Sequence, residues 1–250
     1  MKQKAKILFI DVETSPNLSY IWGNYEQNAL SVEKQWNIIS FSAKWMGGKQ
    51  VTKCLADYRS KDSQDGHLIA DIWKLLDDAD IVVAHNGNSF DLRKINARFV
   101  FHQLPPPSPY KTVDTLLVAR KYFFFTSNHL TDLGEFMGLG KKIETGGFKL
   151  WYDCMAGDKT AWKNMKKYNA QDVKLLEKIY YRLRPWMSGH PNLGMYDDEI
   201  VCPKCGSDNI QMRGFAITSS KKYHRFQCQE CGGWGRTTVS EKTTKPIVNL

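Results

Sequence analysis

Short apolar runs alternate with amphipathic stretches along the first three quarters of the chain. Runs rich in β-branched and aromatic residues predict strands, at 6–12, 36–45, 51–58 and 81–84. Two glycines, Gly47 and Gly48, separate the second run from the third and indicate a hairpin turn. The first run is apolar at almost every position, which predicts a strand that is buried on both faces.

Apolar residues at helical spacing predict helices, at 65–76, 90–103, 112–122, 130–137 and 160–183. A run of prolines that begins at Pro105 stops the second helix, because proline cannot continue one. The glycine-rich, basic segment 138–147 is expected to be a loop. Strands that are followed by alternating helices and a strand predict an α/β domain with a mixed sheet flanked by helices.

The pattern changes in the last quarter, where cysteines and short β-like runs replace the helical spacing. We expect an α/β domain at 1–187, a linker at 188–200, a small cysteine module at 201–240 and a loose tail at 241–250.

Four of the six cysteines form two C-x-x-C pairs that are separated by 22 residues, namely Cys202 with Cys205 and Cys228 with Cys231. Four thiolates at this spacing predict one tetrahedral structural Zn²⁺. The module resembles a zinc ribbon, and the metal would supply much of its folding energy. Because a secreted disulfide protein spreads its cysteines over the fold, the clustering favours a reducing, cytoplasmic compartment, that of the host if a phage encodes the chain.

Basic residues outnumber acidic ones by 35 to 26, a net charge of +9, and most of the surplus lies within 1–187. The balance suggests an acidic partner such as nucleic acid, although charge alone is weak evidence. No apolar run approaches the length of a membrane span, so no membrane partner is expected. The start of the chain leads into the first predicted strand without the features of a signal peptide.

Carboxylates follow the predicted elements in a way that suggests a metal site. Asp11 and Glu13 are two apart on one strand and therefore project from the same face, at a buried position that is costly without a cation. Asp91 stands where a helix begins, so helix capping is its alternative role. Asp172 follows Tyr168 by one helical turn, and the alternative there is a solvated acid beside a core tyrosine.

Three segments together resemble the exonuclease motifs of the DEDD superfamily, in the right order: Asp11-Val12-Glu13, then residues 86–91 (NGNSFD), then residues 168–172 (YNAQD). The tyrosine in the third motif is similar to the tyrosine branch of that superfamily. The second motif resembles the proofreading domain of family B DNA polymerases. The resemblance covers about residues 1–185.

This resemblance implies a ribonuclease-H-like fold and a metal-dependent 3′→5′ exonuclease. Two Mg²⁺ or Mn²⁺ ions would be held by four carboxylates, those of Asp11, Glu13, Asp91 and Asp172. Tyr168 would orient the attacking water, because phenols ionise too high to remove its proton at neutral pH. The chain is too short for a polymerase domain, so we expect a stand-alone nuclease, or a subunit acting in trans, that takes DNA in preference to RNA during replication, recombination or repair.

Substrate contacts follow less directly. By the resemblance Thr14, Asn86 and Phe90 touch the substrate, with a turn cap and a loop brace as the alternatives for the first two. Basic groups grip phosphates and aromatic rings stack on unpaired bases, so the glycine-rich loop and its end supply three further candidates, Lys141, Lys142 and Lys149. His85 is expected to be a structural hydrogen-bonding residue, and Asp114 either caps a helix or supports the metal ligands.

Two alternatives remain. One is a structure-selective endonuclease on the same scaffold, and the other is a non-catalytic nucleic-acid-binding protein that uses the zinc ribbon. The intact carboxylate set argues against the second. The ribbon itself mixes basic and aromatic residues, which suits nucleic acid, while docking of a replication or repair protein is the rival role.

Overall fold

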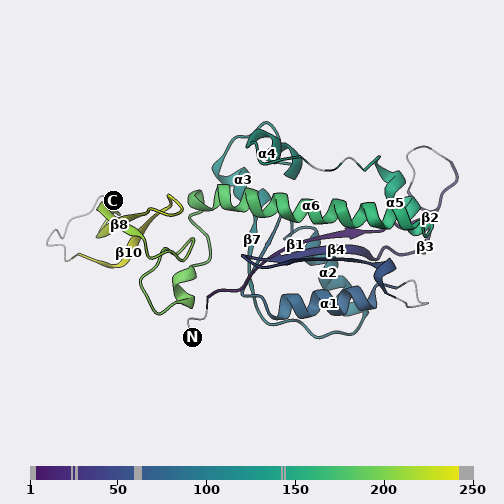
Figure 1. The fold of residues 1–250 in the computed structure, drawn as a ribbon, viewed down its shortest axis with the longest axis horizontal. Coiled ribbons are helices and arrows are strands. Elements are labelled where there is room, and N and C mark those ends of the chain that lie inside the picture. Colours follow the sequence, from purple (N-terminus) through teal and green to yellow (C-terminus); the bar gives the residue numbers. More distant parts are fainter. Residues whose placement is uncertain are drawn as a thin grey trace.

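The computed structural model describes residues 4–23, 25, 28–58, 64–141, 143 and 145–241. Its main body is a five-stranded sheet covered by helices on both faces, and a separate three-stranded sheet lies beyond one end of the longest helix (Figure 1).

The strand that carries Asp11 and Glu13 lies at the centre of the five-stranded sheet. The strand order is β5-β4-β1-β6-β7, with the bounds β1 Ile7–Thr14, β4 Ile38–Trp45, β5 Gln50–Cys54, β6 Ile81–Ala84 and β7 Lys111–Asp114. Strand β1 pairs antiparallel with β4 and parallel with β6. The mixed sheet predicted from the sequence is therefore confirmed.

Helices form two layers around this sheet. Helices α1 (Gly66–Asp77) and α2 (Asp91–Phe101) cover one face, while α6 (Lys159–Leu183) runs along the other, with α3 (Thr115–Tyr122) and α4 (Leu130–Phe136) beside it (Figure 1). Alternation along β1 divides the core into two parts. Ile7 and Phe9 pack toward α6, whereas the alternating residues of the strand, Leu8, Ile10 and Val12, pack toward α1 and α2. Within the described part of the chain, no helix combines the length and the apolar character that crossing a membrane requires.

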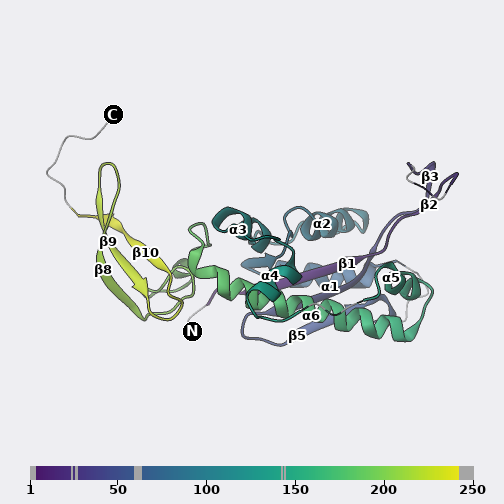
Figure 2. The same cartoon turned by 90° about the horizontal axis from the view of Figure 1, so that it is seen from above.

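The structure corrects four local expectations. The strand predicted at 51–58 ends at Cys54, and residues 55–57 form a short 3₁₀ helix. Residues 111–114 form strand β7, paired parallel with β6, and only the rest of the predicted helix at 112–122 is helical. Helix α5 (Phe148–Met155) begins directly after the glycine-rich segment, where the sequence predicted no helix. Strands β2 (Leu18–Tyr20) and β3 (Ser31–Lys34) form an unpredicted hairpin that projects from the body (Figure 2).

The C-terminal module is a three-stranded antiparallel sheet in the order β10-β9-β8, with β8 Ile210–Ile217, β9 Lys222–Cys228 and β10 Trp234–Ser240. Two short 3₁₀ helices, Arg184–Trp186 and Leu193–Tyr196, connect it to α6. It is fastened to this connection, since the buried Lys204 donates to the carbonyl of Pro185. Residues 242–250 of the predicted tail lie outside the described residues.

A buried cluster of charged side chains connects strand β4 to helices α1 and α2. Asp65, fully buried before α1, accepts hydrogen bonds from the Ile38 amide at 2.8 Å and from Nη2 of Arg98 on α2 at 2.6 Å. Nε2 of His102 lies 2.6 Å from the same carboxylate. One side chain thus fixes the start of β4, the start of α1 and the end of α2.

Replacing Arg98 with Met is expected to destabilise the protein by about 3–5 kcal/mol, because it leaves the buried Asp65 charge without its main partner. Chemical denaturation measures the change. The control is Arg93→Met on the exposed face of the same helix, which should shift stability by less than about 0.5 kcal/mol. Equal stabilities of the two variants would contradict the role given to Asp65.

Candidate active site

Three carboxylates meet where β1 passes under α6. Asp11 and Glu13 project from β1 toward α6, and Asp172 projects from α6 with 1% of its surface exposed. One carboxylate oxygen of each lies within 4.8 Å of the others. Like charges at this separation disfavour joint ionisation unless a cation neutralises them. A set of oxygen ligands alone suits a hard divalent ion such as Mg²⁺ or Mn²⁺, so the residues fit the predicted metal.

Asp91 lies beside this cluster and is not one of the three mutually close groups. It is the first residue of α2, 3% exposed, and its Oδ1 accepts a hydrogen bond of 3.1 Å from the Val12 amide. Val12 stands between Asp11 and Glu13, so this bond fixes the backbone that carries both ligands. The predicted contact of Asp91 with a metal ion stays a prediction.

Sequence reasoning missed Asn169, which holds the Asp11 carboxylate in place. Asn169 is fully buried on α6, and its Nδ2 donates to Oδ2 of Asp11 at 2.5 Å. Its own Oδ1 accepts from the Ser40 hydroxyl of β4 at 3.0 Å, which fixes the orientation of the amide. The signal in the sequence was an amide one residue after Tyr168, at a position that the helical pattern buries.

Tyr168 lies one helical turn before Asp172 on α6. Its ring makes an edge contact with Trp151 of α5, with 5.9 Å between ring centroids. It also lines a cavity of about 380 Å³ together with Ile143 and Lys167. The proposed orientation of a water by its hydroxyl stays a prediction.

The loop between β6 and α2 is braced by Asp114. Its carboxylate accepts from the amides of Asn86 at 2.9 Å and Asn88 at 3.2 Å, and it also caps α3 through the amide of Leu116 at 3.0 Å. Asn86 has a φ of 63°, a left-handed conformation that asparagine tolerates better than most residues. Asp114 therefore has the capping role that was one of its two alternatives, and it also braces the loop that leads to Asp91. Its support of a metal ligand stays a prediction.

His85 has the structural contacts that were expected of it. Its Nδ1 lies 2.9 Å from the Thr115 hydroxyl and its Nε2 lies 3.0 Å from the carbonyl oxygen of Asn128.

A pocket of about 400 Å³ opens next to the last residue of β1. Thr14 lines it together with Trp36, Lys94, Phe148 and Trp151. The Lys94 ammonium lies 3.8 Å from the centroid of the Trp36 ring, and burial lowers its pKa. Of the lining residues, Trp36 and Lys94 were not singled out from the sequence, because they come from separate segments that only the fold brings together.

Phe90 stands beside this pocket. Its ring is 41% exposed and lies 5.1 Å from the same ammonium. Thr14 and Phe90 therefore have positions that a substrate could reach.

The predicted substrate lysines lie on the surface. Lys141 pairs with Glu135 at 3.3 Å, and Lys149 pairs with Asp153 at 2.6 Å, one turn away on α5. Lys142 lies outside the described residues. Exposed ion pairs of this kind contribute little to stability, so a phosphate can compete for the two described lysines.

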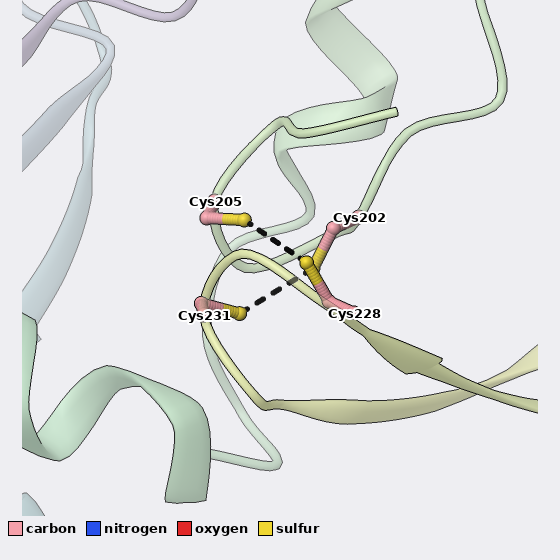
Figure 3. Close-up of side chains that lie close together, drawn as sticks. All are labelled: Cys202, Cys205, Cys228 and Cys231. Atoms are coloured by element: carbon pink, nitrogen blue, oxygen red, sulfur yellow. Dashed lines mark hydrogen bonds between the residues drawn. The ribbon is translucent and has the colours of Figure 1, made fainter. Parts of the chain in front are cut away.

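The four cysteines of the C-terminal module converge on one point (Figure 3). The sulfurs of Cys202 and Cys231 lie 3.8 Å apart, those of Cys205 and Cys228 lie 3.6 Å apart, and all four lie within 4.8 Å of one another. A tetrahedral Zn²⁺ with bonds of about 2.3 Å requires edges of about 3.8 Å, so the cluster fits zinc. A hydrogen bond from Cys205 lowers the pKa of the Cys202 thiol, and the same bond, together with burial, raises the pKa of the Cys205 thiol.

The two C-x-x-C turns have the same backbone form. Each is followed by a glycine with positive φ, 73° at Gly206 and 74° at Gly232. The amide of each glycine donates to the carbonyl of the first cysteine of its pair, at 2.8 and 2.9 Å. The glycines thus turn both pairs toward the same point.

Comparison with known proteins agrees with this geometry. The model of one family, described as the RNase H superfamily, matches residues 8–184. The chain belongs to the RNase H superfamily. The match takes in every carboxylate of the candidate site. The C-terminal module lies beyond it and carries the cysteine cluster of a zinc ribbon.

Among solved structures, this RNase H superfamily member is similar to the family B DNA polymerase of the hyperthermophilic archaeon Pyrobaculum calidifontis, with a TM-score of 0.54 and 15% sequence identity. The similarity covers 73% of this chain and 25% of the polymerase chain, so the two proteins share a fold over about a quarter of the polymerase. No curated protein matches the sequence.

The hydrogen bond from Asn169 predicts a role in metal binding. Asn169→Ala should weaken Mn²⁺ binding about 10–100-fold, because the Asp11 carboxylate loses the donor that orients it. Calorimetric titration of the purified protein with MnCl₂ measures this directly. Asn96→Ala on the exposed face of α2 is the control and should bind Mn²⁺ as the wild type does. Unchanged affinity in Asn169→Ala would overturn the assignment.

The cysteine geometry predicts one zinc ion per chain. Cys202→Ser should lose it and unfold the C-terminal sheet, while the larger sheet keeps its structure because the two have separate cores. Elemental analysis gives the zinc content, and proteolysis followed by mass spectrometry locates the unfolded part. Cys54→Ala, which removes an isolated buried thiol of the larger domain, should retain the zinc. Zinc retention in Cys202→Ser would refute this site.

Proposed function

We propose that the protein is a 3′→5′ exonuclease that hydrolyses phosphodiester bonds with divalent metal ions, with DNA preferred over RNA. The observation that carries the proposal is the convergence of Asp11, Glu13 and Asp172, with Asp91 bonded to the same strand, in an RNase H superfamily fold. A non-catalytic nucleic-acid-binding protein would not require this many acids at one place.

Each residue has a defined part in the proposal. Asp11, Glu13 and Asp172 would hold Mg²⁺ or Mn²⁺, with Asp91 as a further ligand from α2. Two bound divalent ions would activate a water molecule and stabilise the leaving 3′ oxygen. Asn169 keeps the Asp11 carboxylate aimed at the site, and Tyr168 orients the water.

The pocket beside Thr14 supports attack at a strand end. An exonuclease must hold a terminal nucleotide that is no longer paired, and aromatic rings stack on any base. Trp36, Phe148 and Trp151 supply such rings directly next to β1, and Lys94 supplies a cation for a phosphate. The preference for DNA rests on the similarity of the second motif and of the fold to DNA polymerases.

Purified protein with MgCl₂ should shorten a 5′-labelled single-stranded DNA stepwise from its 3′ end. Asp11→Ala should reduce the rate by more than about 100-fold. A loss of up to that size is typical when a residue that contacts a metal ligand, and not the metal itself, is replaced. Asp78→Asn removes an exposed acid remote from the site and should leave the rate unchanged. Duplex DNA and RNA of the same sequence, run in parallel, report the substrate preference.

Other product patterns would replace the proposal with one of its rivals. Internal fragments without a ladder indicate an endonuclease. Binding of the DNA without any cleavage, in wild type and Asp11→Ala alike, indicates a non-catalytic binding protein.

A further inference from the structure

One face of the C-terminal sheet gathers arginine and aromatic side chains. Residues that share a face alternate along each strand and stand opposite one another across the pairing. Here Trp234 is opposite Gln227 and Arg236 is opposite Arg225, with Tyr223 two residues before Arg225 on the same strand. We call this set, completed by Arg213 of β8, the arginine face; its members are Arg213, Tyr223, Arg225, Gln227, Trp234 and Arg236.

The charged groups of this face are held in place by their neighbours. The guanidinium of Arg236 lies 3.8 Å from the centroid of the Tyr223 ring, and that of Arg225 lies 4.8 Å from the centroid of the Trp234 ring. Nε of Arg225 donates to the carbonyl of Arg213 at 3.0 Å. All three arginines are nevertheless exposed, so the N–H groups that these contacts do not use are accessible to a ligand.

The face also forms one wall of a groove of about 400 Å³. Arg225, Trp234 and Arg236 line it on the sheet, and Ser188 and His190 line the opposite wall, in the connection that follows α6. Among the described residues around this groove none is acidic. Glu241, an acid of the same module, pairs with Lys222 and His224, whose side chains alternate with those of the arginine face.

We propose that the arginine face binds the phosphate backbone of a nucleic acid strand whose end occupies the candidate active site. The inference rests on the proposed function for the identity of that strand. Guanidinium groups match phosphate oxygens, and the exposed ring of Trp234 can stack on an unpaired base, a combination that an acidic protein surface would not require.

The position of the face sets the length of strand that reaches both sites. The C-terminal sheet lies past the far end of α6, away from the β2–β3 hairpin (Figure 2). From Asp172 to Leu183 the helix rises roughly 16 Å, at about 1.5 Å per residue. This corresponds to about five stacked nucleotides at 3.4 Å each, and the arginine face lies farther on. Only strands longer than this can touch both.

Binding is best measured without hydrolysis. In the Asp11→Ala background and in chelator-free buffer without added Mg²⁺, fluorescence anisotropy follows a labelled 30-nucleotide oligothymidylate. Adding Arg225→Ala and Arg236→Ala should weaken binding at least about fivefold and make the slope of log affinity against log salt shallower by about 1.4, or about 0.7 for each lost phosphate contact.

Two controls separate this face from general charge and from misfolding. The double variant Lys221→Ala, Lys222→Ala also removes two positive charges, but from outside the arginine face, and it should change the affinity less than twofold. Arg225→Lys with Arg236→Lys keeps the charges and should restore most of the salt slope. Zinc content must match the parent protein in every variant.

The outcomes are distinct. Equal weakening by the arginine and lysine pairs would show a diffuse charge effect, and no weakening by the arginine pair would leave the face to a protein partner; either result overturns the inference. On a five-nucleotide substrate with Asp11 intact, the arginine variant should cleave as the wild type does. Absence of cleavage by the wild type would refute the proposed function while the binding result still stands.

Discussion

Repulsion among carboxylates at one end of a buried strand is the constraint on which the rest of the catalytic domain depends. Strand β1 is central and covered on both faces, yet it delivers Asp11 and Glu13 to a third acid on α6. The surroundings compensate with donors that need no charge: the Asn169 amide bonds to Asp11, and the Val12 amide bonds to Asp91. These bonds fix positions without neutralising the cluster, so the site keeps the negative field that attracts a divalent cation. The same hydrogen bonds link β1 to α2 and to α6, so the geometry of the site and the packing of these elements depend on each other.

Loop chemistry supports this arrangement from a distance. Asp114 stands at the carboxyl end of β7, where it caps α3 and holds two amides of the loop that leads to Asp91. A Cβ at Gly87, inside that loop, would approach the Cβ of Ala84 to 2.4 Å, so only glycine fits the close return of the chain over β6. The ends of three neighbouring strands, β1, β6 and β7, thereby contribute to one region. The placement of the candidate site at the carboxyl ends of parallel strands follows here from specific hydrogen bonds.

Much of the fold and of the candidate site could be predicted from the sequence. The parts that could not be predicted were missed for physical reasons. Strand β6 and helix α6 were predicted to within about one residue because apolar period and length agreed there. Residues 112–114 were assigned to a helix because a four-residue strand has too few positions to reveal its period, and the pairing of β7 with β6 is non-local. The acids of the site were found because charge in an apolar strand is conspicuous. Asn169, Trp36 and Lys94 were missed because their roles arise only when α6, the loop before β4 and α2 come together.

The two modules are stabilised in different ways. The larger domain buries apolar side chains on both faces of β1 and can hold its acids rigidly. The described part of the C-terminal module has few buried side chains, chiefly those of Phe226, Cys202 and Cys228. Its strands therefore need the thiolate cluster for stability and are free to present arginine and aromatic side chains on the outside. The fastening of Lys204 to the carbonyl of Pro185 then matters for more than stability, because it fixes the arginine face relative to α6 and hence to the carboxylates. A flexibly tethered module would raise the local concentration of a strand, but only a fixed one can define the spacing between a phosphate contact and the bond that is cut.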